Sequence, residues 1–361
     1  MANFTLYLLK TLLKTDKRNV YCFFYNSFKK VKMPDFFVKT IIQRYPNKFF
    51  NYFLQKIFSY PKLDKVVGGV DVFYLPHINF ASFSKNSQNV ITIHDLSFLR
   101  YPEFFSFRKN LWHRAINIKK NIKKYDKIIA VSQNTKNDIV ELLKVPENKV
   151  TVIYPGLPGY LNEGNKINDD LSVDYLAQKY NINSDYILYF GTIEPRKNIS
   201  GLISAYNLLR DSGVNCLLVL VGAWGWKTKG IKKEWRASKY KNDIRFIGYV
   251  DDKIKPLLYK QAKVLAYPSF YEGFGFPPLE AMYFGLPVVS SNTSSLPEVL
   301  GDSAILINPD KPQDLAEALK IVMVDENLRN KMILSGRERV KRFSWEETAQ
   351  KYIEIFESLQ K

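Results

Sequence analysis

Two glutamates, Glu272 and Glu280, stand on either side of a glycine-rich stretch in the C-terminal half of the sequence. Gly273 and Gly275 permit a close approach of the backbone to a ligand, and Pro277 suits the first turn of a following helix. The N-terminus of such a helix offers N–H groups and partial positive charge to an anion, for which a diphosphate is a natural ligand. The two carboxylates could bracket that ligand and accept hydrogen bonds from sugar hydroxyls.

A structural explanation of the same stretch stays open. Glu280 is expected in the first helical turn, where a carboxylate also compensates the helix dipole. Glu272 could be a solvated loop acid, and Phe274 and Phe276 could be core residues. In that case the stretch would bind no ligand.

Basic and imidazole side chains follow two other expected strands. Arg196 and Lys197 come after a strand and before a helix, where cations can clamp phosphates and neutralise negative charge that develops in a reaction. They could also be solvated loop residues. His94 directly follows the run 90–93. Ligands of open α/β sheets bind at such strand ends, although a histidine at a strand end is often structural.

Little in the sequence indicates a metal site or a reactive thiol. A metal site for phosphate chemistry would usually carry spaced aspartates at a strand end, but Asp251 and Asp252 are adjacent and fit a helix start. Cys22 and Cys216 sit in apolar runs, as expected for buried thiols in a reducing compartment. We therefore expect no metal and no cofactor.

The elements that position these residues alternate between β-rich runs and helical stretches. This alternation predicts an α/β fold with doubly wound parallel sheets, and 361 residues suggest two domains. We expect domains at 1–160 and 185–343, a linker at 161–184 and a closing helix at 344–361. The expected strands are Val20–Phe24, Asp71–Tyr74, Val90–Ile93, Lys127–Val131, Lys149–Ile153, Tyr186–Phe190, Leu217–Val221, Ile244–Ile247, Val264–Tyr267, Pro287–Ser290 and Ile305–Ile307.

The N-terminal pattern is unusual because Phe4–Leu13 predicts a helix before any strand. Doubly wound domains normally begin with a strand that lies in the middle of the sheet. We therefore expect a strand and a glycine-bearing loop ahead of Asn3, unless another segment supplies that strand.

The stretch Glu272-Gly-Phe-Gly-Phe-Pro-Pro-Leu-Glu-Ala-Met282 resembles the signature of family 4 glycosyltransferases, in which seven residues separate two glutamates. The resemblance covers about 340 residues. It continues in Ile93-His-Asp-Leu-Ser97, Ile129-Ala-Val-Ser-Gln-Asn-Thr135, Val152-Ile-Tyr-Pro-Gly156, Gly191-Thr-Ile-Glu-Pro-Arg-Lys-Asn198, Phe246-Ile-Gly-Tyr-Val250, Leu286-Pro-Val-Val289 and Ser295-Leu-Pro-Glu-Val-Leu300.

The resemblance implies a GT-B fold, with two Rossmann-like domains facing across a cleft and a nucleotide sugar held mainly by the C-terminal one. It implies that Glu280 binds the donor ribose, that Glu272 binds the transferred sugar and that His94 contacts that sugar. Many relatives have an arginine where Thr192 stands, so phosphate clamping would rest on Lys197 and Arg196. The remaining implied donor contacts are the backbone of Gly273, Phe274, Gly275 and Phe276, and the nucleobase segment Gly248, Tyr249 and Val250.

The reaction implied is transfer of a hexose with retention, without a protein nucleophile and with a phosphate oxygen helping to deprotonate the acceptor. Mannose from GDP-mannose is favoured, and UDP- and dTDP-sugars stay open, in a mannosyltransferase-like group of bacterial surface-polysaccharide synthesis. Two carboxylates could also indicate a glycosidase, which the phosphate-binding loop disfavours. A catalytically inactive GT-B scaffold or a membrane-surface binding protein is the main alternative; phosphorylases and epimerases are less favoured.

Charge is segregated along the chain. Residues 1–160 carry 26 Lys and Arg against 10 Asp and Glu, whereas 161–361 carry 27 against 25. The basic and aromatic segment Phe36–Lys62, which Pro46 divides into two expected helical pieces, could lie on an anionic membrane or pack in the core.

We expect a cytoplasmic enzyme, which could be a peripheral protein on the inner face of the cell membrane. Its acceptor would be a glycan or a polyprenyl-diphosphate-linked glycan. No nucleic-acid partner is expected because no recognition motif accompanies the charge.

Overall fold

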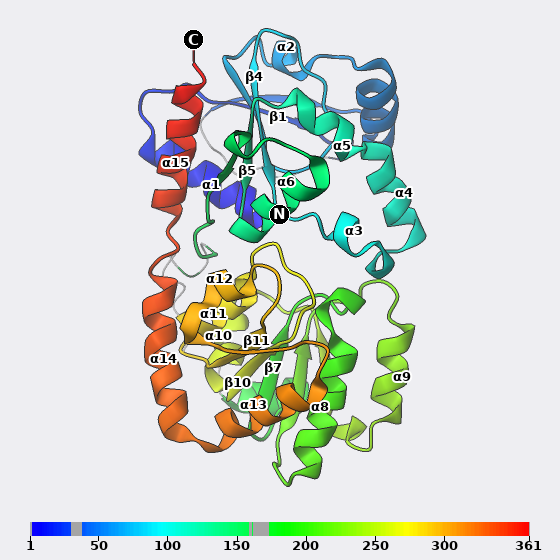
Figure 1. Cartoon of the computed structure of the whole chain (residues 1–361), viewed down its shortest axis with the longest axis vertical. Coiled ribbons are helices and arrows are strands. Elements are labelled where there is room, and N and C mark those ends of the chain that lie inside the picture. Colours follow the sequence, from blue (N-terminus) through cyan, green and yellow to red (C-terminus); the bar gives the residue numbers. More distant parts are fainter. Residues whose placement is uncertain (1, 30–37, 159–160, 162–172, 361) are drawn as a thin grey trace. The chain divides into compact units, whose positions relative to one another are not determined.

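The computed structural model describes residues 2–29, 38–158, 161 and 173–360 (Figure 1). The chain divides into two compact units. Unit 1 comprises Met1–Leu96, Arg108–Gly156 and Phe343–Lys361, and unit 2 comprises Ser97–Phe107 and Leu157–Arg342. The short piece 97–107 of the first half thus belongs to the second unit.

Unit 2 is built on a six-stranded parallel sheet with the order β12-β11-β10-β7-β8-β9. Its four inner strands, β11, β10, β7 and β8, are rich in Val, Ile and Leu and almost wholly buried, as expected when helices cover both faces. The order reverses between β7 and β10, and this switch point is where open α/β sheets bind ligands. The strands are β7 (Tyr186–Phe190), β8 (Leu217–Val221), β9 (Ile244–Gly248), β10 (Val264–Tyr267), β11 (Val288–Ser291) and β12 (Ile305–Ile307).

The helices of unit 2 connect these strands and pack on the sheet, with α8 beside α13 and α11 against α14 (Figure 1). They are α3 (Ser97–Arg100), α7 (Val173–Tyr180), α8 (Ile199–Asp211), α9 (Lys229–Ala237), α10 (Lys255–Gln261), α11 (Phe276–Tyr283), α12 (Leu296–Leu300), α13 (Pro312–Val324) and α14 (Glu326–Val340).

Unit 1 contains a four-stranded parallel sheet of order β3-β4-β5-β6 and a separate parallel pair, β1 and β2. The strands are β1 (Cys22–Asn26), β2 (Lys39–Gln43), β3 (Val72–Leu75), β4 (Gln88–Ile93), β5 (Lys127–Ala130) and β6 (Val150–Val152). The helices are α1 (Ala2–Thr15), the π-helix η1 (Phe49–Phe58), α2 (Leu63–Val66), α4 (Phe107–Ile116), α5 (Ile118–Asn121), α6 (Gln133–Leu143) and α15 (Trp345–Ser358).

The closing helix α15 docks on unit 1, beside α1 (Figure 1). Its Tyr352 hydroxyl lies 2.6 Å from the Thr92 hydroxyl of β4, which in turn lies 2.8 Å from the Tyr74 hydroxyl of β3. Trp345 packs edge-on against Phe4 of α1, with ring centroids 5.4 Å apart. Buried hydroxyls and aromatic rings therefore join the last helix to the first helix and to the sheet.

The predicted α/β class is confirmed. The expected strands Tyr186–Phe190, Leu217–Val221, Val264–Tyr267 and Ile305–Ile307 match the structure to the residue, and the other seven lie within two residues of observed strands. The helix expected over 4–13 is α1, and Ser132 caps α6 by accepting from the Thr135 amide. The strand expected ahead of Asn3 stays a prediction.

One expected element of secondary structure was wrong. The first of the two helical pieces expected in Phe36–Lys62 is in fact strand β2, which pairs with β1. The β-branched run Thr40-Ile-Ile42 favours this extended conformation. Residues 36 and 37 lie outside the described part of the chain.

Among the described residues, we find no helix whose length and apolar character would let it cross a membrane.

We expect the Tyr352 contacts to stabilise unit 1 measurably. Tyr352→Phe removes the hydroxyl from the Thr92 pair and should cost about 1 kcal/mol, whereas Tyr352→Ala also opens a cavity and should cost about 3–5 kcal/mol. Urea unfolding followed by circular dichroism measures both. Tyr249→Ala is the control, because this side chain is 80% exposed; equal losses in Tyr352→Ala and the control would refute the docking contact.

Candidate active site

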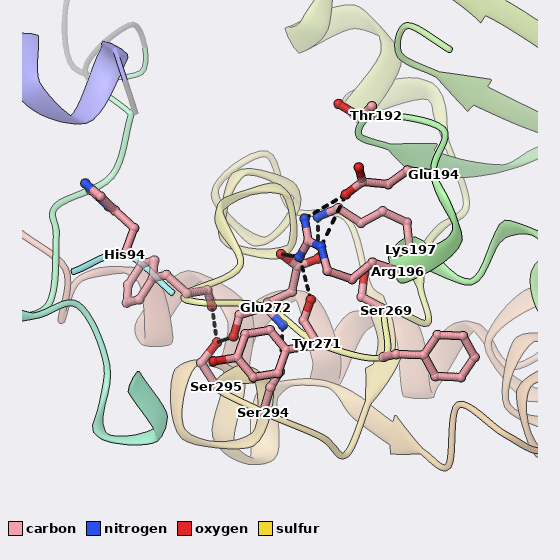
Figure 2. Close-up of polar contacts among 12 residues, drawn as sticks. His94, Thr192, Glu194, Arg196, Lys197, Ser269, Tyr271, Glu272, Ser294 and Ser295 are labelled. Carbon is pink, nitrogen blue, oxygen red and sulfur yellow. Dashed lines mark hydrogen bonds and ion pairs between the residues drawn. The ribbon is translucent and has the colours of Figure 1, made fainter. Parts of the chain in front are cut away.

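The loops after β7 and β10 hold most of the expected site residues. These two strands are neighbours in the sheet and flank its switch point. Because both are parallel, their carboxyl ends lie at the same edge, and the loops 191–198 and 268–275 emerge side by side. Figure 2 shows side chains of the two loops pointing toward one another.

Glu272 is the centre of a buried ionic cluster. One carboxylate oxygen, Oε1, pairs with the Lys197 ammonium, and Oε2 accepts from the Arg196 guanidinium at 3.1 Å (Figure 2). Arg196 also pairs with Glu194 at 2.9 Å. The cluster therefore holds two cations and two carboxylates and is balanced in charge.

The burial of the cluster decides its ionisation. Burial by itself would raise the pKa of Glu272, but Lys197 and Arg196 outweigh it and lower this pKa to about 2. The pKa of Lys197 is lowered by burial, against the opposing effect of Glu272. Glu272 is thus a carboxylate at neutral pH, and the idea of a solvated loop acid is wrong because the side chain is buried and paired.

Tyr267, the last residue of β10, positions the lysine. Its hydroxyl accepts from the Lys197 ammonium at 2.9 Å, and the ammonium lies 5.2 Å from its ring centroid. Tyr189 of β7 stacks on Tyr267 with ring centroids 6.0 Å apart. Neither tyrosine is among the residues predicted for the site, although the position of Tyr267 at a strand end next to the loop indicates one.

Arg196 is built into the loop that carries Glu272. Its guanidinium donates to the Tyr271 carbonyl at 2.6 Å, and its own carbonyl accepts from the Phe270 amide at 2.9 Å. Glu194, which also pairs with the guanidinium, lies in one of the matched motifs but is not among the residues predicted for the site. Arg196 therefore holds the backbone on the N-terminal side of Glu272, and its expected contact with phosphate stays a prediction.

Two serine hydroxyls hold the glycine-rich loop by hydrogen bonds to its backbone. The Glu272 amide donates to the Ser294 hydroxyl at 2.9 Å, and the Ser295 hydroxyl lies 3.0 and 3.1 Å from the carbonyls of Glu272 and Phe274 (Figure 2). Gly275 has φ of +100°, and a Cβ there would meet Leu296 at 2.9 Å. A glycine is therefore needed where the chain turns into α11. The serines were missed as site residues, although Ser295 opens one of the matched motifs.

Glu280 lies in the second turn of α11, so the prediction of a first-turn position was wrong. The helix begins at Phe276, directly after the left-handed Gly275, which makes Glu280 the fifth residue of the helix. Its carboxylate is buried and accepts from the Tyr259 hydroxyl of α10 at 2.9 Å. Compensation of the helix dipole therefore does not explain this residue.

The other expected donor contacts lie at the ends of β7 and β9. Thr192 follows β7, and its carbonyl accepts from the Tyr189 hydroxyl at 3.2 Å. Gly248 ends β9 with φ of +74°, and Tyr249 after it is exposed while Val250 is buried. Within the loop, Phe274 is buried and Phe276 is partly exposed at the start of α11. Ligand contacts of these residues, including Gly273, stay predictions.

His94 lies in unit 1, directly after β4. Its Nε2–H donates to the Pro76 carbonyl at 2.9 Å, and its ring meets Phe4 edge-on at 4.6 Å. Burial lowers the pKa of His94 to about 4, so the imidazole is neutral at neutral pH. These contacts fix the ring, and its contact with a donor sugar stays a prediction.

The described residues contain no group of three or more His, Cys, Asp or Glu side chains placed to bind a metal ion. Asp251 accepts from the Lys253 amide and Asp252 pairs with Lys255 at 2.6 Å. Both aspartates thus serve the turn that precedes α10. Asp169 and Asp170, which fall in the expected linker, lie outside the described residues.

Comparisons with known proteins match both halves of the chain. The family model described as "Glycosyltransferase Family 4" matches residues 2–158, and the one described as "Glycosyl transferases group 1" matches residues 175–339. O-antigen chain mannosyltransferase B of Escherichia coli is 33% identical over 299 residues, which cover 80% of this chain and 73% of that protein.

Two further relatives bear on size and fold. The serotype-specific mannosyltransferase WbdA of E. coli is 30% identical over 75% of this chain, which spans 34% of the length of WbdA. The structure of Anabaena Alr3699/HepE in complex with UDP and glucose is 19% identical with a TM-score of 0.69, covering 98% of this chain and 96% of that one. It shows the same GT-B fold. Matched by family models along both halves and by a relative of 33% identity, the chain belongs to the family 4 glycosyltransferases.

Proposed function

We propose that this glycosyltransferase moves mannose, with retention, from a nucleoside diphosphate sugar to a glycan or polyprenyl-diphosphate-linked glycan. The observation that carries the proposal is the ionised Glu272 held by Lys197 and Arg196 at the switch point of the sheet. Mannose is supported by the two E. coli relatives, both of which are named mannosyltransferases.

Glu272 would bind the transferred sugar. A carboxylate with a pKa of about 2 cannot act as a proton donor at neutral pH, but its oxygens accept hydrogen bonds from sugar hydroxyls. Because Ser294, Ser295 and Arg196 fix the backbone on both sides, the sugar would meet a carboxylate whose place is already set. This arrangement supports a binding role that needs no covalent sugar intermediate on the protein.

Lys197 would stabilise the leaving diphosphate. Of the described residues, only Tyr267 and Glu272 accept hydrogen bonds from its ammonium, which has three donors. The third hydrogen can reach a phosphate oxygen while the other two hold the ammonium in place. A buried cation of this kind is most effective against the charge that develops during bond cleavage, and we propose that it makes a metal ion unnecessary.

The proposed reaction breaks the bond between the anomeric carbon and the diphosphate oxygen. The acceptor oxygen bonds to the same carbon from the same face, and its proton passes to an oxygen of the departing diphosphate. Glu280, oriented by Tyr259, would accept hydrogen bonds from the ribose hydroxyls of the donor. The products are a mannosylated acceptor and a nucleoside diphosphate, with GDP favoured.

We also propose that unit 1 rests on an anionic membrane through η1. One side of this π-helix is fixed to unit 1, because the Gln55 amide donates to the Pro61 carbonyl at 3.0 Å and accepts from the Ser82 amide at 2.9 Å. The opposite side exposes large apolar groups: Phe49, Tyr52, Phe53, Ile57 and Phe58.

The charge of the surroundings supports lipid as the partner of this surface. Lys56 lies over the Tyr52 ring at 4.5 Å, and residues 1–160 carry a net charge of +16. Exposed aromatic groups with neighbouring lysines suit the interface of an anionic bilayer. Such a position would bring the enzyme to a polyprenyl-linked acceptor.

A thermal-shift series with GDP, UDP, dTDP and ADP tests the donor. We expect GDP to raise the melting temperature most, because a ligand at 100 times its Kd adds about 2.7 kcal/mol to stability. Transfer from GDP-mannose to an acceptor glycan, with and without EDTA, then tests the reaction and its independence from metal. A larger shift with UDP than with GDP would overturn the choice of GDP-mannose.

The two glutamates should have different roles in kinetics. Glu272→Gln keeps the shape but loses the charge that binds the sugar, and we expect the rate of transfer to fall about 100-fold or more with bare GDP affinity nearly unchanged. Glu280→Ala should instead weaken GDP binding by about 10-fold or more. Glu338→Gln, an exposed change on α14, serves as the control. Unchanged activity in both site variants would remove the assignment.

Sedimentation with phosphatidylcholine vesicles, with and without phosphatidylglycerol, tests the membrane surface. Binding should rise with the anionic lipid and fall with salt. Ile57→Ser and Phe58→Ser, at positions 54% and 68% exposed, should each weaken binding about 5-fold by the apolar area lost. Leu334→Ser is the matched control, 65% exposed on α14 of unit 2. Equal binding to neutral and anionic vesicles would contradict the proposal.

A further inference from the structure

A short piece of the N-terminal half lies against the loop that carries Glu272. The chain leaves unit 1 after Leu96, contributes residues 97–107 to unit 2 and returns to unit 1 at Arg108. The piece consists of α3 and a 3₁₀ turn at Pro102–Phe104. Neither element makes a strand of the sheet, so the contacts of this piece with unit 2 depend on its side chains and carbonyls.

Two aromatic pairs join this piece to the residues directly before Glu272. The ring of Tyr101 meets the ring of Tyr271 edge-on at 5.8 Å, and Phe104 stacks on Phe270 at 5.5 Å. Tyr101 and Phe104 also stack on each other at 5.5 Å. Tyr271 is buried to 3% exposure. The four rings form a continuous group that covers the backbone leading into Glu272.

Trp226, which follows β8, holds the other side of the piece. Its indole N–H donates to the Phe104 carbonyl at 2.7 Å, and its ring stacks on Phe105 at 6.0 Å. The neighbouring Lys227 ammonium donates to the Glu103 carbonyl at 2.6 Å. The Gly225 amide donates to the Ile193 carbonyl at 2.9 Å, which ties the Trp226 loop to the loop after β7.

We propose that residues 101–105 form a brace that positions Glu272, with Tyr101, Phe104 and Trp226 as positioning residues. The role of the brace in transfer rests on the proposed function. Arg196 and Ser294 hold the backbone of the loop by hydrogen bonds, whereas the brace restrains the side chains of Phe270 and Tyr271. Glu272 lies at the junction of the two restraints, so loosening the brace moves the carboxylate without touching the nucleotide contacts.

Paired substitutions test the brace with a readout that needs no donor. Trp226→Phe keeps a ring against Phe105 and removes the hydrogen bond to Phe104. Trp235→Phe is the matched control, because its indole N–H also donates to a backbone carbonyl of unit 2, that of Lys241 at 3.2 Å, which is not part of residues 101–105. Amide hydrogen exchange over residues 268–275 should quicken about 5-fold or more in Trp226→Phe and Tyr101→Ala, and stay within about 2-fold of the wild type in the control and in Tyr101→Phe.

Kinetics then separate positioning from general stability. We expect kcat for mannose transfer to fall about 10-fold in Trp226→Phe and Tyr101→Ala, with KM for the donor and the affinity for GDP within about 2-fold. Tyr101→Phe, which keeps the ring, should restore kcat. A purely structural role would lower the melting temperature and GDP affinity together with kcat.

The outcomes separate this proposal from the proposed function. Unchanged exchange over 268–275, an equal change in Trp235→Phe, or an unchanged kcat in the brace variants would overturn the brace. A wild-type enzyme that transfers no mannose would overturn the proposed function, and the exchange comparison would still decide whether the brace restrains the Glu272 loop.

Discussion

The site depends on two buried ion pairs between the loops after β7 and β10, in which the Glu272 carboxylate contacts both Lys197 and Arg196. Taking Glu272, Lys197 and Arg196 out of water costs several kcal/mol per ion unless their geometry and remaining hydrogen bonds repay it. Tyr267, Glu194 and the Tyr271 carbonyl supply those bonds. The loops after β7 and β10 therefore hold each other in place, and the contact that we propose between Glu272 and the transferred sugar depends on that arrangement.

Long-range charge and local charge are separated in this protein. The net charge of +16 lies in residues 1–160, while 161–361 carry nearly equal numbers of both signs. The cations of the site nevertheless belong to the nearly neutral half, where each is matched by a carboxylate. Pairing within the loops therefore controls chemistry at the site, whereas the excess charge acts at a distance on anionic surfaces.

The sequence was sufficient to predict features that depend on local pattern. Apolar β-rich runs located the strands of unit 2, and residues such as Lys197 and Glu272 could be placed at strand ends. Their meeting could not be derived from local pattern alone, because it requires β7 and β10 to be neighbours although β8 and β9 intervene in the chain.

Other features were missed for identifiable physical reasons. Glu280 was assigned to the first turn of its helix, but α11 already begins at Phe276, after the left-handed Gly275, so this residue falls in the second turn. Thr40-Ile-Ile42 was predicted to be helical because aromatic and apolar residues precede and follow it in the sequence. The contact of Phe104 with Trp226 joins residues 122 apart in sequence and leaves no periodic trace.

The path of the chain has a consequence for synthesis on the ribosome. Unit 1 needs residues 343–361, which are made only after the whole continuous part of unit 2, 157–342. Until α15 emerges, the faces of β3 and β4 that later contact Tyr352 and Phe356 have no cover from that helix. Unit 2 can therefore begin to fold during translation while unit 1 waits for its last piece. The N-terminal half is thus synthesised first but completes its fold last. In the interval between, its apolar surface is accessible to chaperones.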